Sequence, residues 1–341
     1  MLKDMFFSIS SAFPFSFLRG LVSIPVISPF YHLVTDNSPP HMKYLYNAVS
    51  VKQFTNDIDF MLKHYTPVAV EELPKILLGE KCFSKPALFL SFDDGFSELK
   101  SIVAPILRSK GVPATFFVTP NFIDNSDMLY RCKLSIIADS VCDMPGRIPT
   151  PDFLISKWGG RQVNQSTFRK QLFRLGYNDT ETINAIAKSF NIDFNVYLQK
   201  HKPYLNLNEV KGLAADGFAI GAHSMDHPNF AEIPPEMQKL EILNSLEWVQ
   251  KNVPNQQKLF AFPFSSDGVS ANVLRYFLKD NSKSIDMMFG TSGLKLSPSS
   301  KLLQRIPMEI KGKTGEQILK GEYLYYIAKA IVGKNKTTLP I

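Results

Sequence analysis

The feature that most constrains the fold of this chain is a largely apolar run, residues 87–92, that leads directly into Asp93, Asp94 and Gly95. A short run of this kind is typical of a strand buried on both faces, as in a parallel sheet. A helical pattern at 97–110 and a second apolar run at 115–118 follow, which predicts a strand, helix and strand unit. The two aspartates are therefore expected at the carboxyl end of a buried strand, where α/β enzymes place their chemistry.

Two histidines, His223 and His227, lie far downstream and directly follow another apolar run, residues 217–222. This run predicts a second strand, so the histidines and the paired aspartates would share one rim of a parallel sheet. Neighbouring carboxylates repel each other, and a bound cation allows both to stay ionised. Two imidazoles and one carboxylate are the usual ligands of hydrolytic zinc, which lowers the pKa of bound water toward about 7. Alone, the first motif is most often a turn and the second a pair of ordinary histidines; together they predict metal-assisted hydrolysis.

Three segments resemble motifs of the polysaccharide deacetylases, also called the NodB-homology or carbohydrate esterase 4 family. Residues 91–95, Ser-Phe-Asp-Asp-Gly, resemble the first motif of that family, and residues 223–227, His-Ser-Met-Asp-His, resemble the second. Residues 111–118 are similar to the strand that follows the first motif in the family. The resemblance implies an α/β fold of the distorted (β/α) barrel type.

The resemblance also implies roles for the residues of these motifs. In the family the first aspartate of the pair is the catalytic base and the second is a metal ligand. This makes Asp93 the base and Asp94, His223 and His227 the ligands of a divalent cation. Zinc is the expected metal, and cobalt, nickel, manganese and iron remain open.

A third family segment, usually Arg-x-Pro-Tyr-Gly, is altered in this chain. Residues 261–265 read Ala-Phe-Pro-Phe-Ser, so Pro263 is kept and Phe264 stands in place of the tyrosine. Pro263 and Phe264 are candidates for the substrate site, with a backbone N–H near Phe264 stabilising the oxyanion. The missing arginine normally orients the base, and Arg305 is the candidate replacement; the alternative for Arg305 is an ordinary surface charge.

The histidine that usually supplies the catalytic acid near the C-terminus of family members is absent, because no histidine follows His227. Residues 30–34, Phe-Tyr-His-Leu-Val, resemble the Tyr-His segment of the circularly permuted branch, which includes deacetylases of poly-N-acetylglucosamine. In that branch this histidine is the acid, so the resemblance assigns the role to His32. An apolar run at 26–30 predicts a strand that delivers His32 to the same rim.

The remaining histidines have simpler expected roles. His41 is a second, weaker candidate for the acid or a substrate contact, with loop filler as the alternative. His64, on a helix predicted over 51–64, and His201 are expected to be solvated.

The rest of the chain predicts one barrel, residues 26–332, with a helical insertion at about 121–207 and a polar tail at 333–341. A helix is predicted over 234–252, and its side chains Met237, Leu240, Leu243 and Leu246 follow helical spacing typical of a core-facing stripe.

The N-terminal segment, residues 1–25, is apolar but is interrupted by Pro14 and Arg19. No stretch of about twenty apolar residues is left for a membrane span, and no small-residue cleavage site precedes Tyr31. A hairpin that contacts a membrane peripherally and a helix packed on the barrel are the two alternatives.

The net charge and the cysteines limit which binding partners and which cellular location the sequence predicts. The net charge is +7, but the lysines are scattered, so nucleic-acid binding is not predicted. Three cysteines, Cys82, Cys132 and Cys142, form no Cys-x-x-Cys pair, which predicts reduced thiols and a cytoplasmic location, with membrane association through the uncleaved N-terminal segment. The sequence does not predict an oligomeric state.

The predicted activity is removal of N-acetyl groups from an amino-sugar-containing glycan or glycoconjugate. One alternative is a degenerate family member that binds a glycan without turnover, and the other is hydrolysis of a different C–N amide or an O-acetyl ester. The intact base, Asp93, favours catalysis, because a pure binder has little use for a charged carboxylate beside a metal.

Overall fold

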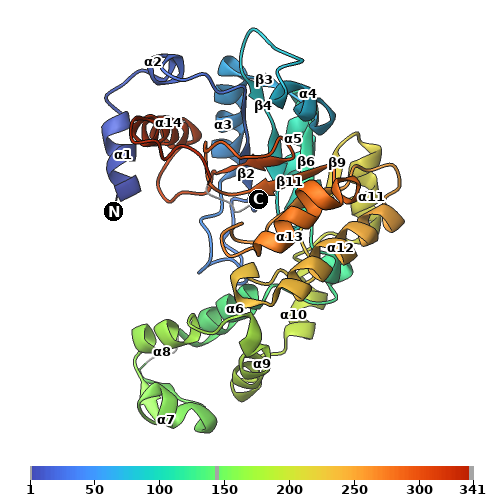
Figure 1. The fold of residues 1–341 in the computed structure, drawn as a ribbon. Helices are drawn as coiled ribbons and strands as arrows, with labels where there is room; N and C mark the ends of the chain where they lie inside the picture. Colours follow the sequence, from blue (N-terminus) through green and yellow to red (C-terminus); the bar gives the residue numbers. More distant parts are fainter. Residues whose placement is uncertain (1, 143–145, 338–341) are drawn as a thin grey trace.

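The computed structural model describes residues 2–142 and 146–337, and its centre is an eight-stranded sheet in which every pairing is parallel (Figure 1). The strand order is β12-β11-β10-β9-β6-β5-β2-β13. The strands are β2 (Pro29–Tyr31), β5 (Leu90–Phe92), β6 (Ala114–Val118), β9 (Ala219–Ala222), β10 (Leu259–Ala261), β11 (Met287–Gly290), β12 (Leu302–Gln304) and β13 (Ile306–Pro307). This order agrees with the predicted strand, helix and strand unit. β5 and β9, which lead into the two motif segments, are separated only by β6.

The sheet curls into a nearly closed barrel, and Arg305 lies at the seam. β12 pairs with β11 on one side, whereas β13, one residue later, pairs with β2 on the other. The backbone N–H of Arg305 donates to Gly290 O at 3.0 Å, and that of Ile306 donates to Ser28 O at 2.8 Å. One bent strand therefore joins the two ends of the sheet, and the predicted distorted (β/α) barrel is confirmed.

Two predicted strands are each divided between sheets. The run at 26–30 forms β1 (Val26–Ile27) and then β2, and the run at 87–92 forms β4 (Ala87–Leu88) and then β5. β1, β4 and β3 (Thr66–Pro67) make a separate three-stranded parallel sheet. The 3₁₀ helix η1 (Val70–Glu72) and α4 (Leu73–Leu77) follow β3, and their side chains pack in the same apolar cluster as Val26 and Ala87.

Aromatic side chains fill the barrel interior. Phe89 lies between β4 and β5, Phe117 lies in β6 and Phe289 in β11, and the ring of Phe289 lies 5.1 Å from each of the other two. A side chain at Gly221 would overlap the Phe117 ring, so glycine makes room for it in the neighbouring strand. These phenylalanines thus serve core packing.

Helices follow the strands and cover the outside of the barrel. They are α3 (Val51–His64), the π-helical turn η2 (Leu99–Val103) continued by α5 (Ala104–Ser109), η3 (Pro120–Asn125), α11 (Leu207–Ala215), η6 (Phe230–Glu232), α12 (Pro235–Asn252), α13 (Ala271–Arg275) continued by the π-helical turn η7 (Tyr276–Asp280), η8 (Ser282–Ser284) and α14 (Gly315–Ile331). The helix predicted over 51–64 has these exact bounds, because Ser50 caps its first turn by accepting a hydrogen bond from the Gln53 N–H.

The segment between β6 and β9 is a helical lobe that extends away from the barrel (Figure 1). It contains α6 (Tyr130–Cys142), η4 (Asp152–Leu154), α7 (Ile155–Trp158), α8 (Gln165–Leu172), η5 (Tyr177–Asp179), α9 (Thr180–Ser189) and α10 (Phe194–His201), with an antiparallel pair, β7 (Ile148–Pro149) and β8 (Gln162–Val163). Ile137, Trp158, Phe168 and Ile183 belong to its own apolar core. The predicted helical insertion is confirmed.

The predicted core stripe of α12 is wrong in part. Met237 and Leu240 are exposed, whereas Leu246 is buried as expected. The buried face instead begins with Gln238 and Glu241, which are polar but hydrogen-bonded. Gln238 donates to Phe230 O at 2.6 Å, and Glu241 accepts from the Met225 N–H at 2.7 Å. Polar side chains can be buried when they are hydrogen-bonded, so the spacing of apolar residues alone predicted the wrong buried face for α12.

The N-terminal segment forms α1 (Leu2–Ser10) and α2 (Phe15–Gly20), and both pack against α14 (Figure 1). Phe7, Phe15 and Leu18 are buried in these contacts. Within the described ranges, no helix combines the length and apolar character that a membrane crossing requires. Cys132 is a buried free thiol and Cys82 an exposed one; the side chain of Cys142 and residues 338–341 of the tail lie outside the described part.

Candidate metal centre

The carboxyl ends of neighbouring strands bring the predicted site residues to one rim of the barrel. Asp93 and Asp94 follow β5, His32 follows β2 and His223 follows β9. β2, β5, β6 and β9 are consecutive in the sheet, and parallel strands place these ends on the same side. All four side chains are buried or nearly so.

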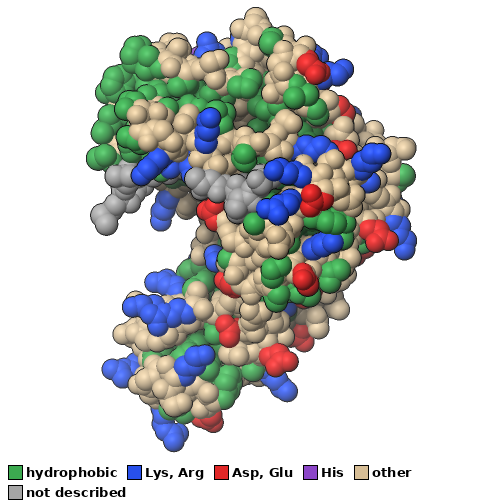
Figure 2. All heavy atoms as spheres, in the orientation of Figure 1, with side chains coloured by type: hydrophobic (Ala, Val, Ile, Leu, Met, Phe, Trp, Pro, Cys, Tyr) green, Lys and Arg blue, Asp and Glu red, His purple; other side chains and the backbone are tan. Residues whose placement is uncertain are grey.

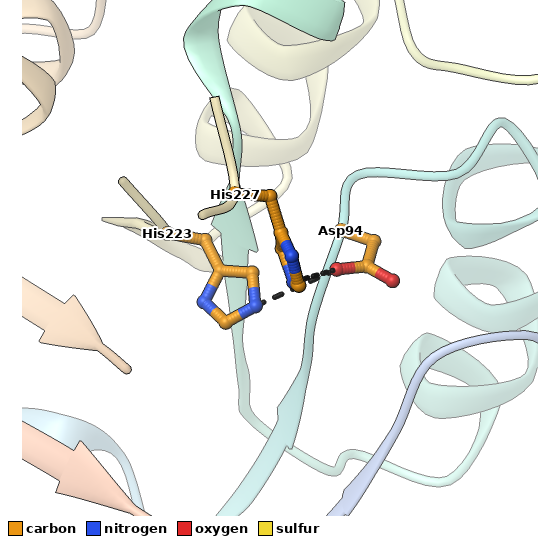
Figure 3. Close-up of side chains that lie close together, drawn as sticks. All are labelled: Asp94, His223 and His227. Carbon is orange, nitrogen blue, oxygen red and sulfur yellow. Dashed lines mark ion pairs between the residues drawn. The ribbon is translucent and has the colours of Figure 1, made fainter. Parts of the chain in front are cut away.

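Asp94, His223 and His227 converge on one point (Figure 3). Asp94 Oδ1 lies 3.2 Å from His227 Nε2 and 3.5 Å from His223 Nε2. One potential ligand atom from each residue lies within 4.8 Å of the others, and all three side chains are buried. The geometry matches the ligand set predicted from the sequence.

These three residues fit a bound cation. Both carboxylate oxygens of Asp94 are buried and accept no hydrogen bond from a described residue, which is costly for a charged group that lacks a cation. The nearby imidazoles hold the pKa of Asp94 well below its usual range despite the opposing effect of burial. Burial lowers the pKa of His227, which keeps its imidazole neutral and able to offer a lone pair.

His223 is oriented for ligation by its second nitrogen. Its Nδ1 lies 2.9 Å from Ala261 O, so Nδ1 carries the proton and donates to that carbonyl. Nε2 is then the lone-pair nitrogen, and it is the atom that faces Asp94. This arrangement of a backbone acceptor behind a metal-binding histidine is typical of protein metal sites.

Asp93 lies beside this centre in a two-pronged ion pair with Arg305. The guanidinium donates from Nη1 to Asp93 Oδ1 at 2.6 Å and from Nη2 to Oδ2 at 2.7 Å. Arg305 is fully buried and also donates to Ser91 Oγ at 3.1 Å. Burial opposes ionisation of Asp93, but Arg305 and His223 outweigh it and lower the pKa of the carboxyl. Arg305 is therefore no surface charge, and it contacts the proposed base.

His32 is held by Glu309, a residue that the sequence analysis did not identify. Glu309 pairs with His32 Nδ1, and its Oε1 accepts the backbone N–H groups of His32 and Leu33, each at 2.8 Å. The Tyr46 ring stacks on the His32 imidazole, with 4.4 Å between the ring centres. Burial lowers the pKa of His32, but Glu309 outweighs it, with Asp94 and Asp93 contributing, and raises that pKa to about 9. His32 is thus protonated at neutral pH.

Phe264 forms one edge of the site. Its ring lies 4.8 Å from that of His227, and the Arg131 guanidinium, from the helical lobe, lies 4.7 Å from the centre of the Phe264 ring. The Phe264 backbone N–H has no acceptor among the described residues, which leaves it free for a substrate oxygen. Pro263 precedes it, and its carbonyl accepts the Ser265 N–H at 2.6 Å in a tight turn.

Several backbones at this rim adopt a conformation that L-residues rarely take. Asp94, Ser224, His227 and Phe264 have φ values of 72°, 60°, 54° and 56°. Such positions cost of order 1–3 kcal/mol each and persist where the surroundings enforce them, commonly at functional sites. The strained residues here include two of the three candidate ligands.

The other histidines do not join the centre. His41 is buried, and its Nδ1 lies 2.9 Å from the Tyr197 hydroxyl of the helical lobe, so it ties a loop to that lobe. His64 is half-buried against Phe15 and Phe60 at 4.8 Å each, so the expectation that it is solvated is wrong. His201 is exposed, as expected.

Comparison with a family model gives a match to "Polysaccharide deacetylase" over residues 80–138 and 172–281. The match contains Asp93, Asp94, His223 and His227, and it leaves out His32 and Arg305. A comparison with curated proteins found no match.

Solved structures share the fold. A Streptococcus pyogenes deacetylase, PplD, superposes with a TM-score of 0.53 at 16% identity, covering 88% of this chain and 98% of the other. IcaB from Ammonifex degensii gives 0.53 at 14% identity, with the same coverage. A de-N-acetylase from Aggregatibacter actinomycetemcomitans gives 0.50 at 13% identity over 87% and 99%. By its motifs, its matched segments and its barrel, the chain belongs to the polysaccharide deacetylase family.

Proposed function

We propose that this protein is a metal-dependent hydrolase that removes N-acetyl groups from an amino-sugar-containing glycan or glycoconjugate. One observation carries the proposal: the three buried candidate ligands lie next to a second carboxylate, Asp93, which a different residue holds in place. His223 Nε2 faces Asp94 at 3.5 Å and Asp93 Oδ2 at 3.9 Å, while Asp93 is bound to Arg305. A pure binding site gains nothing from the second buried carboxylate.

Asp94, His223 and His227 would hold a divalent cation of the zinc class. Such a cation lowers the pKa of a water toward about 7 and polarises an amide carbonyl. The set of one oxygen and two nitrogen donors suits zinc, and cobalt, nickel, manganese and iron are the other candidates.

Asp93 acts as the general base in this proposal. Its lowered pKa keeps it ionised at neutral pH, so it can accept the proton of the attacking water. Arg305 fixes the carboxylate through two parallel hydrogen bonds, and it therefore serves as a positioning residue. The water oxygen adds to the carbonyl carbon of the N-acetyl group.

His32 acts as the general acid. Glu309 occupies Nδ1, so Nε2 is the nitrogen left to protonate the departing amine as the C–N bond breaks. The N–H of Phe264 would donate to the oxygen that becomes negative. The products are acetate and a free amino sugar, and the proton that His32 gives is balanced by the one that Asp93 takes.

The choice of an N-acetylated glycan rests on family membership and on the resemblance of residues 30–34 to the branch that acts on poly-N-acetylglucosamine. The similarity of the fold to a protein described as a de-N-acetylase supports an amide over an ester. N-acetylglucosamine oligomers are a substrate of this class that carries no lipid, and they are the first to test.

The test is acetate release from N-acetylglucosamine oligomers by metal-loaded protein, compared with Asp93→Asn. Loss of the base should lower turnover by about 10²–10⁴-fold while metal content is unchanged, because Asp93 is not a ligand in this proposal. Asp226→Asn is the matched control, since Asp226 lies in the second motif but bonds to Asn121 at 2.6 Å, outside the centre. Turnover of Asp93→Asn equal to the unmodified protein would contradict the proposal.

A further inference from the structure

The outer side of the N-terminal helices carries a row of exposed apolar side chains that no part of the proposed catalysis uses. Met5, Ile9, Phe13, Phe17 and Leu21 recur every four residues through α1, the turn after it and α2. They are between 36 and 55% exposed. We call these five residues the apolar face.

The residues of the apolar face are not those that pack α1 and α2 onto the rest of the molecule. Phe7, Phe15 and Leu18 already bury the inner side of α1 and α2 against the molecule. Of the thirteen large hydrophobic side chains exposed in the described part, seven lie on this segment or at the end of α14, on which it packs. In Figure 2 much of the surface over α1 and α2 is green, with Lys and Arg side chains near its margin. Apolar patches of this kind mark interaction sites.

Aromatic and basic groups border the apolar face in a way that suits a lipid surface. Phe13 and Phe17 stack 5.9 Å apart, and Phe6 packs edge-on against Tyr325 at 5.3 Å. The Lys329 ammonium lies 4.2 Å from the Tyr325 ring, at the edge of this aromatic pair. Aromatic rings flanked by a lysine are typical of the boundary between lipid headgroups and acyl chains.

We infer that the apolar face is a docking surface for an anionic lipid bilayer, on which α1 and α2 lie flat. The nine and six residues of these helices are too few to span a bilayer, so the binding is peripheral. The net charge of +7 complements anionic headgroups. The five side chains would enter the headgroup and upper acyl region, which removes their apolar area from water.

The test is sedimentation of the full chain with vesicles of phosphatidylcholine alone or mixed with phosphatidylglycerol. The unmodified protein should bind the mixed vesicles, and Ile9→Ser/Phe13→Ser/Phe17→Ser should bind more than about tenfold more weakly, because three of the apolar side chains that would enter the bilayer are lost. Leu78→Ser/Phe153→Ser/Val196→Ser is the matched control, since its three residues are 53–60% exposed elsewhere on the molecule. This control should bind as the unmodified protein does.

Three results separate the inference from its alternatives. The melting temperature from circular dichroism and the metal content should be the same in the unmodified protein and both triple variants, since no altered residue touches the metal centre. If the triple variant of the apolar face fails to fold, Phe17→Ser alone replaces it. Unmodified protein that stays in the supernatant with both vesicles overturns the inference. So does a dimer, measured by light scattering, that becomes monomeric in the triple variant without vesicle binding, because the face would then join two copies of the chain.

Discussion

At the scale of single residues, the site consists of charged pairs that fix the protonation of each partner. Asp93 is kept ionised by Arg305, and His32 is kept protonated by Glu309. Base and acid thus have opposite charge states at neutral pH, as the proposed reaction requires. Each pair gives a prediction that can be tested through pH dependence.

The first prediction concerns Glu309. Activity needs protonated His32, so it is present at low pH and lost as pH rises through the pKa of His32. That pKa is about 9 with Glu309, Asp94 and Asp93 contributing. A bound cation offsets the two aspartates, so the alkaline limb of kcat/KM should lie between 6.5 and 9. Glu309→Gln should move this limb to lower pH by about one unit or more.

The measurement is the pH profile of kcat/KM for both proteins at saturating metal. Glu316→Gln provides a matched control, because the Glu316 side chain is 44% exposed and pairs with Lys320 at 2.8 Å, outside the candidate site. An alkaline limb that stays in place in Glu309→Gln would show that His32 is not the titrating acid.

The second prediction concerns Arg305. Arg305→Lys keeps a positive charge but cannot make two parallel hydrogen bonds to Asp93. The pKa of Asp93 should rise, and since the base works only when ionised, the acidic limb of the profile should move to higher pH. Loss of orientation should also lower kcat/KM by about 10–100-fold.

Arg108→Lys, measured over the same pH series, is the control for replacing an arginine outside the site. Its pH profile should match that of the unmodified protein. Arg108 is exposed and pairs with Asp216 at 3.3 Å, and neither residue belongs to the candidate site. Equal profiles for Arg305→Lys and the unmodified protein would remove Arg305 from the catalytic arrangement.

At the scale of elements, α12 supports the loop that carries the candidate ligands. Glu241 Oε2 accepts the backbone N–H groups of Met225 and Asp226, which lie between His223 and His227. Burial raises the pKa of Glu241, while these hydrogen bonds oppose the rise. The helix thus fixes the turn in which His227 adopts its rare φ of 54°.

The third prediction follows from this contact. Glu241→Ala should release the loop and weaken metal binding by about 10–100-fold, the effect usual for residues that support ligands from behind. Glu247→Ala is the control, because Glu247 is exposed on the same helix. Zinc titration by calorimetry measures both, and equal affinities would show that the loop is fixed by other contacts.

α12 also shows where sequence patterns are insufficient. Apolar spacing predicted the helix over almost its true bounds, since helices are recognised by period. It selected Met237 and Leu240 as core residues, yet both are exposed. The buried positions Gln238 and Glu241 bond to backbone groups of distant segments, and a linear sequence does not reveal those partners.

At the scale of the whole molecule, the two ends of the chain complete the barrel and the site. β2, which delivers His32, pairs with β13, which follows Arg305 and precedes Glu309. His32 and Glu309 lie 277 positions apart in sequence, and both fall outside the segments that match the family model. The site is therefore assembled only when the sheet closes.

This closure explains which site residues were predictable. Asp93, Asp94, His223 and His227 lie in motifs at the ends of recognisable strands, so their convergence followed from strand parallelism. Glu309 lies in no motif, and its one signal in the sequence is an acidic side chain shortly after the short strand β13. Its partnership with His32 depends on which strands become neighbours, and local sequence does not encode that.

The central claim is that Asp94, His223 and His227 bind a metal. Elemental analysis of purified protein should give about one divalent metal ion per chain, both in the unmodified protein and in Asp93→Asn. His223→Ala/His227→Ala should lose it, because one carboxylate alone is a weak site. Equal metal content in the double variant, or no metal in the unmodified protein even after reconstitution with zinc, would contradict the claim.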